Sequence, residues 1–358
     1  MLEQQNNLYK YPLALTQQFR HCGNPFRADT YKGCSFGCKY CFANLRGGKI
    51  EKDFKVADIE IIKKKFYKAF DVPSSTKDLT VELLRHKVPI HLGGMSDPFQ
   101  KAEFEYKATY KLLELTKKYR YPMMISTKAA FLPDEYYSIL DNQIHAFQIS
   151  LISMDNNYIR RFEPNTPPPE DRVDFIKKLK SYGFWVGIRI QPLININEAF
   201  GVVKELSGIV DYITVEHIKI GNDNNNKRWM FEEMNLSPTD FKCCGREYEL
   251  KTDIKRKNIN ELKAISKCPI GCGDNDLHFM SDSDNCCGID TINSNFDGWI
   301  KYNSMYLNKG NANNVWYPKC NCSSCFNSEM RVSGLDFKGY VDLYMSAPPK
   351  EKQCNFKL

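Results

Sequence analysis

The cysteines of this chain are unevenly distributed, and this restricts what it can fold into. Four of the fourteen lie within the first 41 residues, none lies from 42 to 242, and ten lie from 243 to 354. Secreted disulfide proteins are usually short and begin with an apolar signal, which the opening residues MLEQQNNLYK do not resemble. The apolar stretch 184–194 is too short to span a bilayer and contains Arg189. We therefore expect a cytoplasmic chain without a membrane segment, whose reduced cysteines serve metal or redox chemistry.

The cysteine-free middle of the chain alternates short apolar runs with amphipathic segments. The runs are typical of buried strands, and the segments between them have helical spacing of apolar residues. The expected strands are 27–31, 88–94, 122–127, 145–153, 185–194 and 211–218, and the expected helices are 57–70, 107–120, 134–140, 168–183 and 197–208. Alternation of this kind favours a parallel sheet whose chemistry gathers at the carboxyl ends of the strands.

This pattern predicts an α/β fold, a partial (βα)6 TIM-type barrel with a cysteine-rich C-terminal extension. We expect an N-terminal segment over 1–25, the barrel over 26–220 and the cysteine-rich region over 221–358. After residue 220 polar residues and cysteines dominate, and long periodic segments are few. We expect this last region to pack on the barrel.

The strongest motif is the segment 33–42, Gly-Cys-Ser-Phe-Gly-Cys-Lys-Tyr-Cys-Phe, in which Cys34, Cys38 and Cys41 have the spacing C-x3-C-x2-C. Three thiolates on a short glycine-containing loop can bind three irons of a cubic [4Fe–4S] cluster. The fourth iron is then open to a substrate or cofactor. The alternative is a zinc site with a distant fourth ligand, although zinc sites favour paired C-x2-C knuckles.

The loop and the six βα units that accompany it resemble the radical SAM superfamily. The resemblance implies that S-adenosylmethionine (SAM) binds the open iron through its amino and carboxylate groups. One electron from the cluster then cleaves SAM to methionine and a 5′-deoxyadenosyl radical, which abstracts a hydrogen atom from the substrate.

Several strand ends match positions that this superfamily uses to hold its cofactor. The residues that the resemblance assigns to the SAM site are Phe42, Gly93, Gly94, Lys128, Ser150 and Arg189. The two glycines also fit a simple turn after a strand. Arg189 lies in an apolar strand and needs either a ligand carboxylate or a structural acid as its partner. Glu216 and His217 end the last strand, where they either line the pocket or belong to the core.

Within the superfamily, the chain is most similar to the spore photoproduct lyase-like branch over residues 20–290. The segments that carry this similarity are 33–44, 94–99, 126–128, 161–172 and 281–288. Glu163 and Arg172 could alternatively form a structural ion pair. The lyase returns a hydrogen atom from a cysteine near the second strand, where this chain has Gly94. The same reaction would therefore need a cysteine from the C-terminal region, and Cys22 is expected to be an ordinary thiol.

The C-terminal region contains a second candidate metal site. Cys320, Cys322 and Cys325 have the spacing C-x-C-x2-C, and Cys268 or Cys272 could complete the set. Such a site would suit zinc or an auxiliary iron–sulfur cluster. The alternative is a collection of buried free thiols.

The leading hypothesis is therefore a radical SAM enzyme, lyase-like, that receives electrons from a flavodoxin or ferredoxin. A nucleic-acid base is one candidate substrate, and the net charge of 50 − 43 = +7 permits a phosphate-bearing partner. The lysines and arginines are scattered, however, whereas DNA-binding proteins usually cluster them. A peptide or a small molecule is the alternative substrate. A non-catalytic zinc protein that binds nucleic acid is the alternative of another class.

Overall fold

The structure is a computed structural model that describes residues 8–10, 12–16, 22–45, 54–72, 78–221, 229–244 and 247–307. Its centre is one curved sheet of eight strands in the order β14-β10-β9-β8-β7-β6-β3-β2. Neighbouring strands from β3 to β14 are parallel, and β2 is antiparallel to β3. The strands are β2 (Leu13–Leu15), β3 (Phe26–Ala28), β6 (Ile90–Leu92), β7 (Met123–Thr127), β8 (His145–Ser150), β9 (Val186–Leu193), β10 (Tyr212–His217) and β14 (Ile270–Cys272).

The six predicted strands are all present, and the predicted α/β partial barrel is confirmed. The sheet does not close, because β14 and β2 form its two edges. Both edge strands come from outside the six predicted units. Each of them is three residues long, too short for an alternating pattern to reveal it.

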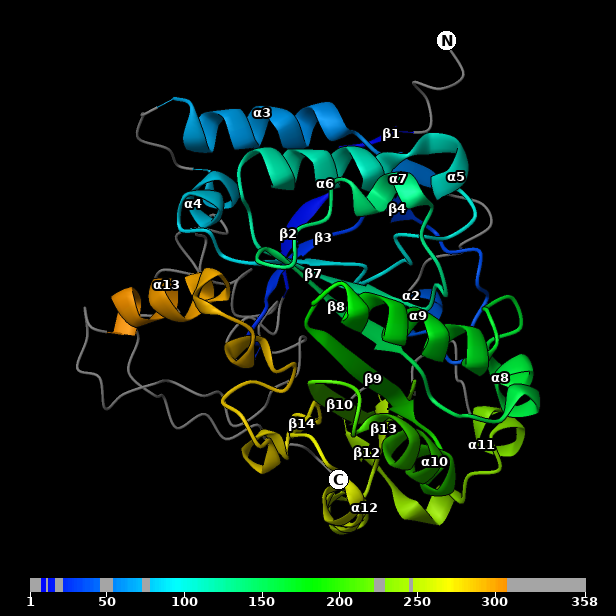
Figure 1. The fold of residues 1–358 in the computed structure, drawn as a ribbon. Coiled ribbons are helices and arrows are strands. Elements are labelled where there is room, and N and C mark those ends of the chain that lie inside the picture. The colour runs from blue at the N-terminus through cyan, green and yellow to red at the C-terminus, as the bar shows by residue number, and fades with distance from the viewer. Residues whose placement is uncertain are drawn as a thin grey trace.

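Helices cover the outer face of the sheet, as Figure 1 shows for α3, α6, α9 and α10. The α-helices are α2 (Phe42–Leu45), α3 (Ile59–Phe70), α4 (Leu79–Arg85), α5 (Glu103–Tyr106), α6 (Ala108–Lys118), α7 (Asp134–Tyr137), α8 (Asn156–Phe162), α9 (Pro169–Ser181), α10 (Ile196–Leu206), α11 (Trp229–Glu233), α12 (Thr252–Ile265) and α13 (Gly298–Leu307). None of the helices in the described ranges is long and apolar enough to cross a membrane.

Two smaller sheets flank the main one. One has the order β1 (Leu8–Tyr9), β5 (Lys55–Ala57) and β4 (Tyr31–Lys32). The other has the order β11 (Lys219–Gly221), β13 (Glu247–Leu250) and β12 (Phe241–Cys244). Their strands have two to four residues each, so sequence periodicity does not predict them.

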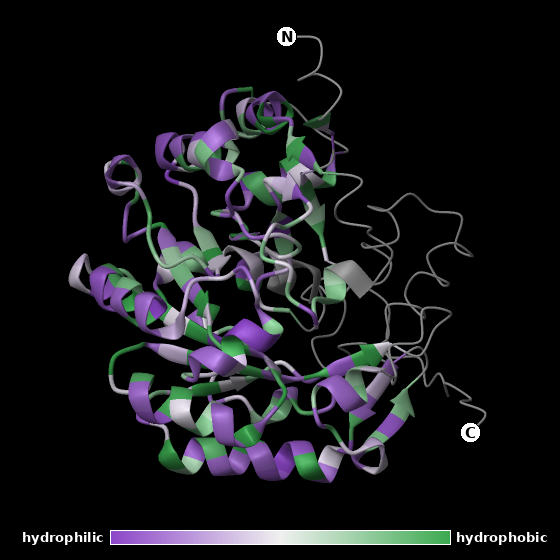
Figure 2. Cartoon of the chain, turned by 90° about the vertical axis from the view of Figure 1, so that its right-hand side faces the viewer, coloured by the Kyte–Doolittle hydropathy of each residue, from purple (hydrophilic) through white to green (hydrophobic). Residues whose placement is uncertain are grey.

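Alternation along the strands separates an apolar outer face from a polar inner face. Ile125, Phe147 and Ile188 are fully buried and belong to the main core, where the apolar faces of the helices pack. In α3 the buried residues Ile59, Ile62 and Phe66 have helical spacing, and Figure 2 shows hydrophobic and hydrophilic residues interleaved along the helices.

Polar side chains on the inner face form a connected row, here called the inner polar row: His91, Ser126, Gln148, Arg189 and Thr214. His91 Nε2 lies 2.7 Å from Ser126 Oγ, which donates to Gln148 Oε1 at 3.2 Å. Gln148 Nε2 in turn donates to Thr214 Oγ1 at 3.3 Å. Five strands therefore present polar groups to the interior of the barrel.

Residues 283–296, here called the closing segment, cover the inner face near the amino ends of the strands. Cys287, Ile289 and Phe296 form a small buried cluster with Met124 of β7 and Ala146 of β8. The closing segment, which belongs to the described part of the C-terminal region, thus packs on the barrel.

Candidate active site

The cysteine loop lies directly after β4, and glycines determine its course. Gly33 and Gly37 have φ angles of 92° and 64°, in the left-handed region that favours glycine. Cys38 is buried, and Cys34 and Cys41 are partly exposed. The three thiols are near enough to influence one another, because Cys41 raises the pKa of both Cys34 and Cys38. The loop therefore gathers its three sulfurs in one small region.

Segments that follow the carboxyl ends of β6 and β8 hold the loop in place. The buried Gln100 accepts from the Ser35 N–H and donates to the Gly33 carbonyl, both at 2.8 Å. The Lys39 N–H donates to the Phe162 carbonyl at 2.9 Å, and Asn165 Nδ2 donates to the Ser35 carbonyl at 3.1 Å. The protein itself therefore preorganises the loop.

Replacing Gln100 by leucine should weaken the attachment of the cysteine loop to the segment after β6. The change removes two partly buried hydrogen bonds and leaves the Ser35 N–H and the Gly33 carbonyl without this partner, at a cost of up to about 1 kcal/mol each, since water can reach them in part. We expect reconstituted Gln100→Leu protein to lose iron to a chelator several-fold faster than the wild type, in the range of outer-shell changes at metal sites. The decay of iron–sulfur absorbance measures this rate. Asn165→Ala, which removes one longer bond, is the milder control, and equal decay rates in all three proteins would contradict the prediction.

A buried ion-pair network lies beneath the loop. Glu163 and Arg172 are both fully buried, and Arg172 Nη2 donates to Glu163 Oε2 at 2.7 Å. The Tyr40 hydroxyl donates to the other carboxylate oxygen of Glu163, and Lys128 Nζ lies 3.6 Å from that oxygen. Lys128 and Arg172 keep the pKa of Glu163 low despite its burial. The structural ion pair considered from sequence is present, and it supports the tyrosine between Cys38 and Cys41.

Burial disfavours the charged form of two of the loop thiols, those of Cys34 and Cys38. Burial raises the pKa of Cys34 to about 11 and that of Cys38 to about 12. The positive charge of Lys128 opposes this rise at Cys38, and backbone hydrogen bonds from Asp97 and Phe36 oppose it at Cys34. A coordinating metal deprotonates such thiols outright, and nearby cations and N–H groups then stabilise the sulfur charge.

The loop supplies the three thiols that a [4Fe–4S] cluster with one open iron requires. A zinc ion needs its ligands about 2–2.3 Å from one point. Among the described residues, no group of three cysteine, histidine, aspartate or glutamate side chains has that arrangement. A four-iron cube spreads its thiolates over separate irons. That Cys34, Cys38 and Cys41 hold three irons of a [4Fe–4S] cluster stays a prediction from their spacing.

Gly93 is required by close packing at the end of β6. Its φ is 88°, and a Cβ atom there would lie 2.3 Å from the Ser126 carbonyl oxygen. At Gly94 a Cβ would lie 3.2 Å from Cδ of Arg27 on the inner face. The tight turn after β6 therefore explains the glycine at position 93. At position 94, the lack of a side chain leaves room for the side chain of Arg27.

The other predicted cofactor residues lie at separate places around the loop and the inner face. Phe42 begins α2 directly after Cys41 and is 43% exposed. Lys128 pairs with Glu163, and its positive charge acts on Cys38, as described above. Ser150 ends β8, where its carbonyl accepts from Arg172 Nη1 at 2.9 Å. Their roles toward SAM stay predictions.

Arg189 is not paired with a structural acid among the described residues, and its other expected partner, a ligand carboxylate, stays a prediction. Its Nη1 donates to Gln148 Oε1 at 3.4 Å and its Nε donates to Gln191 Oε1. Gln191 in turn donates to Glu216, which pairs with Lys219 at 3.1 Å. Among the described residues, no carboxylate forms an ion pair with Arg189 itself. Amide side chains, which sequence spacing does not predict, hold this arginine on the inner face.

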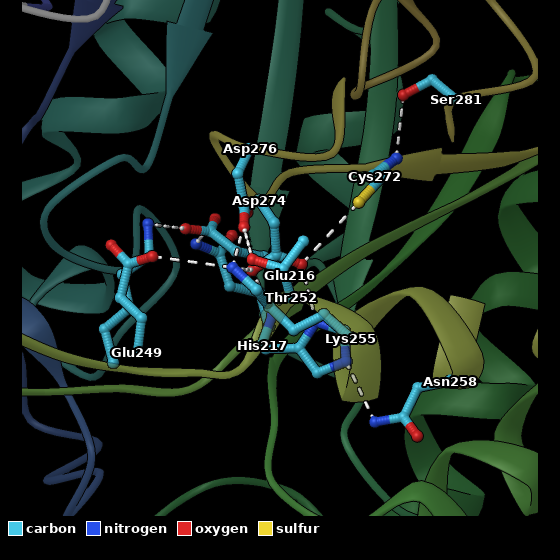
Figure 3. A network of polar contacts seen from close by, with 12 residues as sticks. Glu216, His217, Glu249, Thr252, Lys255, Asn258, Cys272, Asp274, Asp276 and Ser281 are labelled. Atoms are coloured by element: carbon cyan, nitrogen blue, oxygen red, sulfur yellow. Dashed lines mark hydrogen bonds and ion pairs between the residues drawn. The ribbon is translucent and has the colours of Figure 1, made fainter. Parts of the chain in front are cut away.

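His217 belongs to a buried structural network at the end of β10 (Figure 3). Its Nδ1 lies 2.6 Å from Asp274 Oδ2, and Asn258 Nδ2 lies 3.1 Å from its Nε2. The buried Lys255 of α12 binds Asp276 at 2.5 Å and lies 3.9 Å from Asp274. These contacts support the interpretation that His217 belongs to the core.

Replacing Asp274 by asparagine should destabilise the fold by about 2–4 kcal/mol at neutral pH, because Lys255 and His217 lose a buried partner. Hydrogen bonding to His217 lowers the pKa of Asp274 against the effect of burial. The carboxylate therefore stabilises the fold above its unfolded pKa near 3.9 and loses this effect as the pH falls through its lower folded pKa. Urea unfolding at pH 7 and below pH 4 should show the difference between the proteins shrinking in acid. Asp276→Asn at the more exposed end is the control, and an equal loss there would contradict the argument.

The predicted second metal site falls largely outside the described residues, since Cys320, Cys322 and Cys325 lie there. Of its two candidate additional ligands, Cys272 Sγ donates to Asp274 Oδ2 at 3.7 Å and Cys268 Sγ lies 3.8 Å from Ser266 Oγ. Nothing in the described ranges tests this prediction.

Two cysteines of the C-terminal region do reach the inner face of the barrel. The Cys286 carbonyl accepts from Thr214 Oγ1 at 2.9 Å, and the Cys287 carbonyl accepts from Gln148 Nε2 at 3.4 Å. Sequence analysis missed their position, because the closing segment is irregular and lies far along the chain from these strands.

Comparison with known proteins gives the class of this chain. Residues 29–199, which contain the cysteine loop and the strands from β6 to β9, match the sequence model of the radical SAM superfamily. The chain therefore carries a domain of the radical SAM superfamily.

Its fold is also that of spore photoproduct lyase. A lyase variant with dinucleoside spore photoproduct matches with a TM-score of 0.53 and 16% identity, over 72% of this chain and 78% of that one. A variant with bound AdoMet and the same product matches with a TM-score of 0.51 and 17% identity, over 67% and 72% of the two chains.

Curated relatives by sequence come from distant sources. Uncharacterized protein Rv2578c of Mycobacterium tuberculosis is 26% identical over 198 residues, 52% of this chain and 53% of the relative. Uncharacterized protein ORF301 of Acidianus two-tailed virus is 21% identical over 179 residues, 48% of this chain and 57% of the relative. The match thus spans only about half the length of these relatives.

Proposed function

We propose that this chain is an enzyme that cleaves SAM reductively at a [4Fe–4S] cluster bound by Cys34, Cys38 and Cys41. The observation that carries the proposal is the cysteine loop, held at the carboxyl end of a radical SAM sheet with its three thiols together. The bound cluster and SAM together supply a 5′-deoxyadenosyl radical, which abstracts hydrogen from the substrate.

The residues around the loop would orient SAM and support the cluster. Lys128 places a positive charge near Cys38, where it would balance the charge of the thiolate. Its Nζ lies 5.8 Å from the centre of the Tyr40 ring in the same loop. Gly93 and Gly94 keep side chains away from the end of β6, and Phe42 offers an exposed ring next to Cys41. Ser150 and Arg189, adjacent in the pairing of β8 and β9, present polar groups to the interior.

For the substrate we favour a nucleic-acid base, on the support of the fold shared with a lyase whose structure holds a dinucleoside spore photoproduct. Modification of a peptide or a small molecule is the second candidate. A flavodoxin or ferredoxin in the cytoplasm would supply the electron, and a second metal, zinc or iron–sulfur, would be bound by the C-terminal cysteines. Incubating active enzyme with oligonucleotides and with peptide pools, followed by mass spectrometry, distinguishes the two substrate classes.

Anaerobic reconstitution tests the reaction itself. The protein should bind about four irons at the loop, and the electron paramagnetic resonance signal of the reduced cluster should change when SAM is added. Dithionite and SAM should then yield 5′-deoxyadenosine. A protein that takes up zinc alone and leaves SAM intact would instead support the non-catalytic zinc-binding alternative.

A further inference from the structure

Arg27 is a charged residue on the inner face of the barrel to which the proposed cleavage of SAM gives no role. It lies in β3 between Phe26 and Ala28, whose fully buried side chains belong to the main core on the outer face. Successive side chains of a strand point to opposite faces, so Arg27 points inward. Its register partner on β6 is His91, the first member of the inner polar row. Arg27 therefore extends this row by one strand.

The side chain of Arg27 lies against Gly94, just beyond the carboxyl end of β6. A Cβ atom on Gly94 would lie 3.2 Å from Arg27 Cδ and 3.9 Å from Arg27 Nη1. The same connection after β6 contains Gln100, which holds the cysteine loop. Because the chemistry of such barrels gathers at the carboxyl ends of the strands, the guanidinium is on the side where a substrate is expected to bind.

The guanidinium of Arg27 has no partner within the described part of the chain. Its Nε is buried without a hydrogen bond, and no described carboxylate forms an ion pair with it. Asp29 is close along the chain, but its Oδ1 accepts from the Met95 N–H at 2.7 Å. Burial raises the pKa of Asp29, and Arg27 opposes that rise only from beyond ion-pair distance. A partly buried charge without a partner costs free energy, so such a group is normally paired.

The other arginine of the inner face, Arg189, has protein partners. Gln148 accepts a hydrogen bond from its Nη1 at 3.4 Å, and Gln191 accepts one from its Nε. His91 adds no charge, because burial, Arg189 and Arg27 lower its pKa to about 3. Of the two arginines, only Arg27 keeps its N–H donors free of every described residue. The fold thus presents one unused guanidinium to the interior of the barrel.

We propose that Arg27 binds the phosphodiester of a nucleic-acid substrate and so fixes the position of the base in the barrel. A phosphodiester carries one negative charge, and its oxygens match the planar donors of arginine. A base that reaches the interior brings a phosphodiester with it on its own sugar. The inference rests on the proposed function, since it takes the substrate to be the nucleic-acid base favoured there.

Calorimetric binding of a dinucleotide to anaerobically reconstituted protein, with and without SAM, tests this role. One probe is thymidylyl-thymidine, which carries a single phosphodiester, and the other is its methylphosphonate analogue, which has a similar shape but no charge. The wild type should bind the charged probe at least about tenfold more tightly than the neutral one, as is typical of hydrogen bonds to a charged group. Arg27→Gln should bring this ratio close to one by weakening the binding of the charged probe alone.

Arg120→Gln is the matched control. Arg120 is exposed, pairs with Asp141 and lies before the amino end of β7, at the opposite end of the strands. Its replacement removes the same charge and should leave the ratio at the wild-type value. Arg27→Lys keeps the charge without the planar set of donors, and it should give an intermediate ratio even if Arg27→Gln does not fold.

The proposal is overturned if the wild type binds both probes equally or if Arg27→Gln keeps the preference. It is also overturned if Arg27→Gln weakens the binding of SAM, or of an acetylated dipeptide carboxylate, instead of the dinucleotide. The yield of 5′-deoxyadenosine from the wild type without dinucleotide is recorded separately. No yield would contradict the proposed SAM cleavage, whereas a yield without any preference between the probes would contradict only the role of Arg27.

Discussion

Cys38→Ala protein is expected to lose reductive SAM cleavage, with 5′-deoxyadenosine formation falling at least about a hundredfold, beyond the usual effect of outer-shell changes. Cys38 is the buried member of the three, and the charges of Lys128 and Glu163 both act on its thiol. Removing its sulfur leaves two thiolates for a cube that needs three. Iron analysis and product formation are measured on the same anaerobic sample.

Cys243→Ala is the control for this change. Cys243 is exposed on β12, in a sheet separate from the barrel, so its removal should leave iron content and product formation near wild-type levels. If Cys38→Ala retained SAM cleavage while its iron content stayed normal, the assignment of the loop as the cluster site would be wrong.

Arg172→Met should be the most destabilising single change near the site. It leaves the Glu163 carboxylate buried, with only the more distant Lys128 nitrogen as a cation. Breaking a buried ion pair from one side costs about 3–5 kcal/mol. Glu163→Gln should cost less, because the amide still accepts a hydrogen bond. Urea unfolding, followed by tryptophan fluorescence on reconstituted protein, measures both.

The double variant Glu163→Gln/Arg172→Met tests the reason for this loss. Because the buried charge is then removed together with its partner, the double variant should be more stable than the sum of the single losses predicts. Arg172→Lys keeps the charge and serves as the milder variant if Arg172→Met does not fold. If the losses of stability in the two single variants simply added up in the double variant, the broken ion pair would not be the cause of the destabilisation.

The sequence predicted the strands that have long apolar runs and missed those that tertiary pairing creates. The run 145–153 is apolar enough to be recognised alone, and the structure contains β8 there. The three residues of β14 have no pattern, and they become a strand because β10 offers a free edge. The helix α12 was missed for a different reason, since it is rich in lysine and asparagine.

The grouping of three cysteines in one loop was predictable from their spacing, and their role as iron ligands stays a prediction. Cys34, Cys38 and Cys41 follow from their spacing, and the structure brings them together. The support of the loop by Gln100 and the amide partners of Arg189 were not predictable, because they depend on side chains that meet only in three dimensions.

The late position of the closing segment has a consequence for biosynthesis. A nascent chain that has emerged from the ribosome only as far as α10 already contains Met124 and Ala146 but not the residues that cover them. Until residue 296 follows, these apolar side chains remain uncovered on one side, and chaperone capture or aggregation competes with completion of the fold at this stage.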